Sequence, residues 1–125
     1  MAIELKLSGT SLGDYGKAIY EKCHFTCIYC GFDGRVFDAW MQLSIDHIRP
    51  RAKGGTDAPS NLVVACRACN SITSRMRFAA NDTRESIINQ KRQRVAERRG
   101  IFYQDWMKTV APLFLKRPLP KIGSI

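Results

Sequence analysis

Two pairs of cysteines, each in a Cys-x-x-Cys arrangement, place the strongest constraint on how this chain can fold. Cys27 and Cys30 form the first pair, and Cys66 and Cys69 form the second, with 35 residues between the pairs. Four thiolates in two such pairs are a common ligand set for structural zinc, which they enclose in a tetrahedron. Buried free thiols are the alternative. The pattern predicts a closed zinc site that ties two distant segments together and leaves no open position on the ion for catalysis.

Two neighbouring residues that can bind metal stand outside this pattern. Cys23 precedes Cys27 by a Cys-x-x-x-Cys spacing, which is less usual for zinc, so we interpret Cys23 as a core cysteine. His24 is a substitute ligand in principle. We expect it instead to be a partly buried histidine with no part in the chemistry.

The length and hydropathy of the chain indicate a single globular domain. Its 125 residues are typical of one domain, and a structural metal would help to stabilise the modest core. No apolar run approaches the roughly 18 residues of a membrane span, and the N-terminus lacks the apolar segment of a signal peptide. We therefore expect a cytoplasmic protein without a membrane partner, in which reduced cysteine pairs bind metal instead of forming disulfides.

The stretch between the two cysteine pairs predicts a β-hairpin followed by a helix. Residues 35–48 contain β-rich runs, Val-Phe and then Met-Gln-Leu-Ser-Ile, so a strand should end near position 46. After a Gly-Gly loop, the apolar run at 62–64 predicts the antiparallel partner strand. Apolar residues at helical spacing over 69–80 predict a helix that packs on this hairpin. The expected fold class is α+β, with the zinc site joining hairpin and helix and with further helices on the flanks.

The flanking segments have weaker signals. Alternation over residues 3–7 predicts a short edge strand, and residues 15–23 predict a short helix. We place the motif core at about 23–80, a basic helical extension at about 82–113 and an extended tail at 114–125. In the extension, Asp82 and Glu85 resemble a capping box, Gly100 is expected to divide the segment into two helices, and Phe102 and Trp106 have helix-core spacing.

A group of polar residues lies between and beside the cysteines. Asp46 and His47 are adjacent, Asn61 precedes the second strand, and Asn70 directly follows the second cysteine pair. Histidine has an unperturbed pKa near neutrality and suits a general base, while carboxylate and amide oxygens suit Mg²⁺. Hydrolysis of a phosphodiester needs these parts. Because neighbours on a flat strand point to opposite faces, Asp46 and His47 can share one site only where the strand twists or bends.

The ordered motifs C-x-x-C, D-H-I-x-P, G-G, N-L and C-x-x-C-N, spanning about residues 27–77, resemble the HNH, or ββα-metal, endonucleases. The resemblance implies that His47 is the general base, that Asp46 and Asn70 bind a catalytic metal, and that Asn61 orients the loop that carries the histidine. Asn70 replaces the family's last histidine, as in the H-N-N variants of phage junction-resolving nucleases and RNA-guided CRISPR nucleases. An amide is a harder ligand than imidazole, so Mg²⁺ or Mn²⁺ is favoured. A lysine that often follows one turn later is Thr73 here.

The net positive charge is confined to the second half of the chain. Residues 1–65 carry seven basic and seven acidic side chains, whereas residues 66–125 carry thirteen and four, so the second half holds the whole net charge of +9. Such a one-sided positive field suits binding to a nucleic acid. For a run of charges alone, the alternative is a solvated helix face without such a partner. Beside the nuclease motif we expect phosphate contacts from seven residues: Arg75, Arg77, Lys91, Arg92, Arg94, Arg98 and Arg99.

The favoured interpretation is a metal-dependent endonuclease that nicks or cuts double-stranded DNA, with 5′-phosphate and 3′-hydroxyl products; RNA is a second candidate substrate. One alternative is a non-catalytic zinc module that binds nucleic acid. Another is the nuclease subunit of a larger phage packaging or restriction machine, in which a partner protein supplies specificity. The joint presence of Asp46, His47 and Asn70 favours catalysis, because a binding module has no need of all three.

Overall fold

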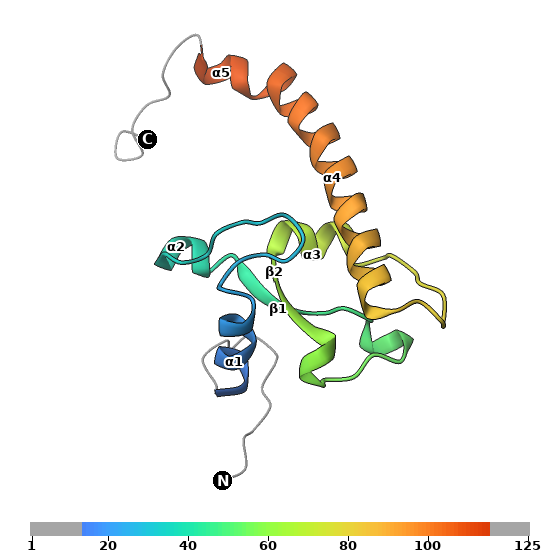
Figure 1. Ribbon diagram of the computed structural model, residues 1–125. Helices are drawn as coiled ribbons and strands as arrows, with labels where there is room; N and C mark the ends of the chain where they lie inside the picture. The colour runs from blue at the N-terminus through green and yellow to red at the C-terminus, as the bar shows by residue number, and fades with distance from the viewer. Residues whose placement is uncertain (1–13, 116–125) are drawn as a thin grey trace. The chain divides into compact units, whose positions relative to one another are not determined.

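The computed structural model of the protein describes residues 14–115, and Figure 1 labels its elements. The described chain forms two compact units, one up to Val95 and one from Ala96 onward. In chain order, the helices, strands and two 3₁₀ turns are α1 (Asp14–Lys22), α2 (Phe37–Trp40), β1 (Leu43–His47), η1 (Arg51–Lys53), η2 (Pro59–Asn61), β2 (Leu62–Cys66), α3 (Arg67–Thr73), α4 (Arg84–Thr109) and α5 (Ala111–Leu115). Within residues 14–115, none of the helices is both long enough and apolar enough to cross a lipid bilayer.

The centre of the first unit is a two-stranded antiparallel hairpin. β1 pairs with β2 so that Leu43 lies opposite Cys66 and His47 lies opposite Leu62. Every residue of β2 is buried, because α1 and α3 contact the hairpin, as the ribbon in Figure 1 also shows. This arrangement confirms the expected α+β class, with a hairpin and a following helix.

Two of the expected elements differ in extent. The Val-Phe run does not form a strand: α2 begins at Phe37, and both aromatic rings at its ends, Phe37 and Trp40, stack with centroids 6.4 Å apart. The helix after the second cysteine pair ends at Thr73 and does not reach residue 80. The Thr73 hydroxyl donates to the Cys69 carbonyl and the Ser74 hydroxyl donates to the Ser71 carbonyl, and such side-chain bonds compete with continuation of a helix.

The start of α4 is capped by a different residue from the one expected. The Thr83 hydroxyl accepts a hydrogen bond from the Ser86 amide at 3.1 Å, as an N-cap residue does. The Asp82 carboxylate instead accepts from the Ala79 amide at 2.8 Å and thereby closes the preceding turn. Gly100 does not divide the segment, because α4 runs without interruption for 26 residues. A glycine inside a helix costs only about 1 kcal/mol relative to alanine.

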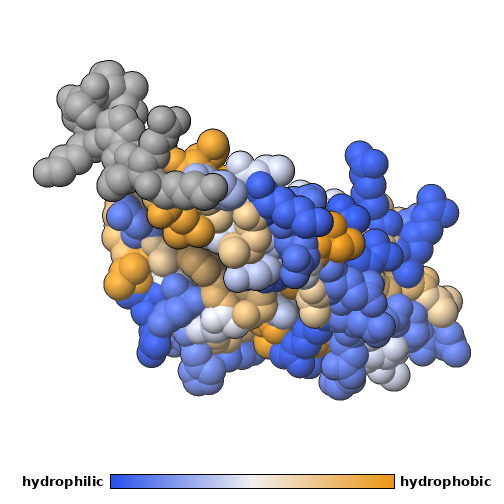
Figure 2. Space-filling view, turned by 90° about the horizontal axis from the view of Figure 1, so that it is seen from above, coloured by the Kyte–Doolittle hydropathy of each residue, from blue (hydrophilic) through white to orange (hydrophobic). Residues whose placement is uncertain are grey.

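The second unit contains the end of α4 and the short α5. Pro112 lies in the first turn of α5, where a helix needs no backbone N–H from it, so residues 114 and 115 are helical and not extended. Trp106 packs on Tyr103 and Phe114, with ring centroids 6.2 and 5.7 Å away. Phe102 and Trp106 are nevertheless 47% and 39% exposed, unlike core residues, and hydrophobic areas are visible at the surface in Figure 2. The expected edge strand at 3–7 and the tail at 116–125 lie outside the described residues.

Candidate active site and metal centre

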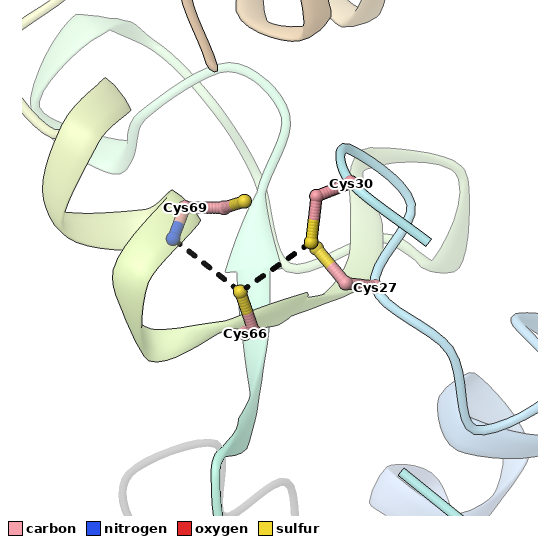
Figure 3. Close-up of side chains that lie close together, drawn as sticks. All are labelled: Cys27, Cys30, Cys66 and Cys69. Atoms are coloured by element: carbon pink, nitrogen blue, oxygen red, sulfur yellow. Dashed lines mark hydrogen bonds between the residues drawn. The ribbon is translucent and has the colours of Figure 1, made fainter. Parts of the chain in front are cut away.

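The four paired cysteines meet at one point, as Figure 3 shows. Cys27 and Cys30 come from the loop after α1, Cys66 ends β2, and Cys69 lies in the first turn of α3. All four sulfur atoms lie within 4.8 Å of one another, and the sulfurs of Cys30 and Cys66 are 3.8 Å apart. A tetrahedral zinc ion with Zn–S bonds of about 2.3 Å has sulfur–sulfur edges of about 3.8 Å. The cluster therefore fits a closed structural zinc site, as the cysteine spacing predicts.

Backbone geometry explains why each pair converges. The Gly31 amide donates to the Cys27 carbonyl at 2.9 Å, and Gly31 has a φ of +80°, a conformation that favours glycine. In the second pair, the Cys66 sulfur accepts from the Cys69 amide at 3.5 Å and so also caps α3. In each turn the two sulfur atoms point toward the centre of the four-cysteine cluster.

The thiols influence one another's ionisation. A hydrogen bond from Cys69, together with smaller backbone contributions, lowers the pKa of Cys27 to about 5. The same hydrogen bond raises the pKa of Cys69, and burial is the main cause that raises the pKa of Cys30 to about 11. Because zinc binds thiolates, its uptake by this cluster releases protons and depends on pH.

Cys23 and His24 lie outside the cluster. The Cys23 sulfur accepts from the Val64 amide at 3.4 Å and packs against the core, as expected for a core cysteine. His24 is exposed, not partly buried, and has a φ of +54° at the turn that follows α1. Among the described residues it belongs to no group that could hold a metal ion.

The end of β1 opens into a second, polar site. Asp46, His47 and Asn70 line one pocket of about 270 Å³, together with Thr73 and Lys91 among others. The adjacent acid and base thus reach the same space, because His47 is the last residue of β1 and the strand does not continue beyond it. The structure therefore brings together residues that a flat strand would have separated.

Asp46 is buried in a network that extends to the zinc knuckle. Its Oδ2 atom accepts from the Tyr29 hydroxyl at 2.6 Å and from Lys91 Nζ at 3.1 Å. Tyr29 stands between Cys27 and Cys30. Burial, followed by the nearby Asp46 charge, raises the pKa of Tyr29, so its hydroxyl stays protonated and donates. The cysteine cluster thereby helps to place the Asp46 carboxylate.

Lys91 is not on the exposed basic face from which the sequence predicts phosphate contacts. Its side chain is 3% exposed and also donates to the His47 carbonyl at 3.0 Å. The ammonium lies over the rings of Tyr29 and Phe78, with centroids at 5.4 and 5.8 Å. Lys91 is buried because the buried Asp46 carboxylate needs a counter-charge. Periodicity of the helix alone does not reveal such a distant partner.

Replacement of Lys91 with alanine should destabilise the first unit by about 3–5 kcal/mol, because it leaves the Asp46 carboxylate buried without its cation. The measurement is urea unfolding of zinc-loaded protein. Lys108, which is exposed on the same helix, provides the matched control, and Lys108→Ala should change stability by less than about 0.5 kcal/mol. Equal unfolding midpoints for both variants would contradict the prediction.

Asn61 joins the two ends of the loop that follows β1. Its Oδ1 atom accepts from the Arg49 amide at 2.8 Å, and its Nδ2 atom donates to the carbonyls of Arg49 and Thr56 at 3.0 and 2.8 Å. All three hydrogen bonds are to backbone atoms of one loop. Asn61 is therefore suited to shaping this loop, which begins two residues after His47.

His47 has a partner that the sequence interpretation missed. Its Nε2 atom lies 2.7 Å from Oδ1 of Asp57, which belongs to the same loop. The hydrogen bond with His47 is the main cause that lowers the pKa of Asp57. An aspartate ten residues after the histidine is not part of the motif that the sequence analysis used, so only the folded loop reveals the pair.

The Asn70 side chain is held through its nitrogen atom. Asn70 Nδ2 donates to the Ser44 hydroxyl at 3.4 Å, which leaves the amide oxygen as the atom suited to a cation.

Arg92 is exposed, but its Nε atom donates to the Ile28 carbonyl at 2.9 Å. The other arginines singled out from the sequence are exposed: Arg75, Arg77, Arg94, Arg98 and Arg99.

One family model matches the stretch that contains the cysteine pairs and the acid–base pair. Residues 27–75 match the family model described as HNH endonuclease. Among solved structures, the Type IV phosphorothioation-dependent restriction endonuclease ScoMcrA is similar, with a TM-score of 0.41 and 25% sequence identity over 66% of this chain. The matched part is 16% of that protein's chain. No curated protein matches the chain.

Proposed function

From the match of residues 27–75 to the HNH endonuclease family model, we propose that the protein is a metal-dependent endonuclease that hydrolyses phosphodiester bonds of double-stranded DNA. The observation that carries the proposal is the meeting of Asp46, His47 and Asn70 in one pocket. The pocket combines a base with two oxygen ligands, which are the parts that this hydrolysis requires.

In the proposed reaction, His47 takes a proton from a water molecule whose oxygen bonds to phosphorus. The bond from phosphorus to the 3′ oxygen breaks, and that oxygen takes a proton from solvent. The products carry 5′-phosphate and 3′-hydroxyl ends. Asn61 supports the reaction at a distance by shaping the loop that follows His47.

The donor set at the pocket fits a hard divalent cation. Asp46 uses only Oδ2 for its hydrogen bonds with Tyr29 and Lys91, and Asn70 offers an amide oxygen, so we propose that these two residues bind Mg²⁺ or Mn²⁺. When bound, the ion would stabilise negative charge on the phosphate and on the leaving oxygen. The zinc cluster takes no part in this chemistry, since four thiolates leave no open coordination position.

The decisive test is plasmid cleavage by zinc-loaded protein with Mg²⁺, with Mn²⁺ and with neither. The best variant is Asp46→Asn, because the new amide oxygen can still accept from Tyr29 and Lys91 while the negative charge is lost. It should keep its zinc and a native fold, at a lower unfolding midpoint because the buried Lys91 ammonium loses its counter-charge, but it should lose Mg²⁺-dependent cutting. Asp38→Asn, at an exposed position in α2, is the control and should cut normally. A wild type that binds DNA but never cuts it would favour the non-catalytic zinc module.

The proposed DNA contacts come from the exposed arginines. Such phosphate contacts carry little sequence information, so specificity would have to come from elsewhere, for example a partner protein in a larger machine. Replacing Arg94, Arg98 and Arg99 with alanine should weaken binding to all sequences alike. It should also flatten the dependence of log K on log salt by up to about three units, at about 0.9 per phosphate contact.

The measurement is a salt titration of DNA binding with protein that also carries His47→Ala, so that the substrate stays intact. Zinc content and the unfolding midpoint should match those of the single variant, because all three arginine side chains are exposed. An unchanged slope would assign these arginines to a solvated helix face and place the DNA path on another surface, such as that of Arg75 and Arg77.

A further inference from the structure

We propose that Asp57 is a positioning residue that holds the His47 imidazole in one orientation and one tautomer. Its carboxylate oxygen Oδ1 lies 2.7 Å from His47 Nε2, the length of a charge-assisted hydrogen bond. A carboxylate only accepts, so Nε2 carries the proton. In the neutral imidazole with this tautomer, Nδ1 is the unprotonated nitrogen, and it is the atom that can take a proton from water. The inference rests on the proposed function in giving His47 the role of base.

Asp57 can do this because its loop is built to a fixed shape. On one side of it, Asn61 Nδ2 donates to the Thr56 carbonyl at 2.8 Å. On the other, the Asn61 amide donates to the Ala58 carbonyl at 2.8 Å, and the Ala58 amide donates to the Thr56 hydroxyl at 3.3 Å. Both neighbours of Asp57 are therefore held by hydrogen bonds within one short turn.

Gly55 adds a steric constraint on the same loop. A Cβ atom at this position would lie 1.7 Å from the Arg49 carbonyl oxygen, so the loop approaches the backbone just after β1 more closely than any larger residue allows. The loop is thus packed against the segment that carries His47, and Asp57 is brought to the ring by backbone structure.

The other charge near Asp57 does not replace His47 as its partner. Arg51 Nε lies 3.8 Å from the same Oδ1 atom, but the Arg51 side chain is 69% exposed, and ion pairs of such exposed groups contribute little. The His47 side chain is 20% exposed, and its hydrogen bond is much shorter. Asp57 therefore interacts more strongly with the His47 imidazole than with the Arg51 guanidinium.

Loss of Asp57 should release the ring. Without an acceptor at Nε2, the imidazole can rotate and can carry its proton on Nδ1, and in that form Nδ1 cannot act as a base. The zinc cluster and the oxygens of Asp46 and Asn70 are held by other contacts and should not respond. The expected defect is therefore a lower catalytic rate with unchanged metal and DNA affinity.

The first experiment is ¹⁵N NMR of the imidazoles in the full, zinc-loaded chain without Mg²⁺. The chain has only two histidines, and the exposed His24 serves as an internal reference. Wild-type His47 should show a protonated Nε2 and an unprotonated Nδ1. In Asp57→Ala the two nitrogens should move toward averaged shifts of a tautomer mixture, while His24 stays unchanged. A protonated Nδ1 in the wild type, or identical His47 shifts in the variant, would overturn the proposal.

The second experiment measures cleavage by the same variant. Asp57→Ala should lower kcat by about 10- to 100-fold, the size typical for groups that orient a site's ligands. KM and the Mg²⁺ concentration for half-maximal rate should not change. Asp38→Ala is the matched control and should keep the wild-type rate. A variant that cuts at the wild-type rate refutes the positioning role while leaving the nuclease proposal intact. If the wild type does not cut, the nuclease proposal fails, and the NMR result still decides whether Asp57 holds the ring.

Discussion

Replacing Cys66 with serine should remove zinc and unfold the first unit. Cys66 ends β2, its sulfur lies 3.8 Å from that of Cys30, and it accepts from the Cys69 amide at the start of α3. One substitution therefore disconnects the strand, the helix and the upstream loop. A structural zinc site can contribute about 10–16 kcal/mol, which is comparable to the whole stability of about 5–15 kcal/mol of a typical domain.

The measurement combines zinc analysis of purified protein with far-ultraviolet circular dichroism. Cys23→Ser is the matched control, because Cys23 is also a cysteine packed against the core but lies outside the cluster. It should retain one zinc ion and a cooperative unfolding transition. Wild-type protein that is folded without zinc, or a Cys66→Ser variant with native stability, would contradict a structural role for the cluster.

Replacing His47 with alanine should leave a folded, zinc-loaded protein that cuts DNA about 10²–10⁴-fold more slowly, the usual effect of losing a general base. The fold should tolerate the change for two reasons. The Lys91 hydrogen bond goes to the backbone carbonyl of residue 47 and not to the ring. Within residues 14–115, the hydrogen bond of the ring itself is to Asp57, which is partly exposed.

Single-turnover cleavage of one plasmid at saturating Mg²⁺ is the measurement, and the unfolding midpoint and zinc content are recorded for the same preparations. His24→Ala is the control, since His24 is exposed and outside the pocket. It should cut at the wild-type rate. Wild-type cutting by His47→Ala would exclude His47 from the mechanism, and the search for the base would turn to other residues that line the pocket.

Local pattern was sufficient for the metal cluster and for the hairpin. The Cys-x-x-Cys spacing determines that two sulfurs can converge within one turn, and the β-rich apolar runs locate both strands, although burial does not alternate along either strand. The adjacent Asp46 and His47 and the later Asn70 were also identifiable, since their chemistry is characteristic of hydrolysis. What the sequence left open was whether a strand could present two adjacent residues to one pocket.

Helix boundaries were less predictable, because they depend on competing hydrogen bonds. The apolar spacing that suggested a helix up to residue 80 persists in the sequence, yet α3 ends where the hydroxyls of Thr73 and Ser74 bond to the backbone. At Gly100, by contrast, the helix continues where the sequence predicted a division. The local preference of this glycine against a helix is small, and the strong helix formers that precede it, residues 96–99, favour a continuous α4.

The sequence by itself predicted the four cysteines that cluster, the strand pairing, and the aspartate, histidine and asparagine that meet in one pocket. Only the tertiary structure decided how these groups are held. Lys91 reaches Asp46 across 45 positions of the chain, Tyr29 links the same carboxylate to the zinc knuckle, and Asp57 meets His47 through a folded loop. The physical reason is that periodicity records which face of an element is apolar, whereas the partner of a buried charge is set by which elements pack together.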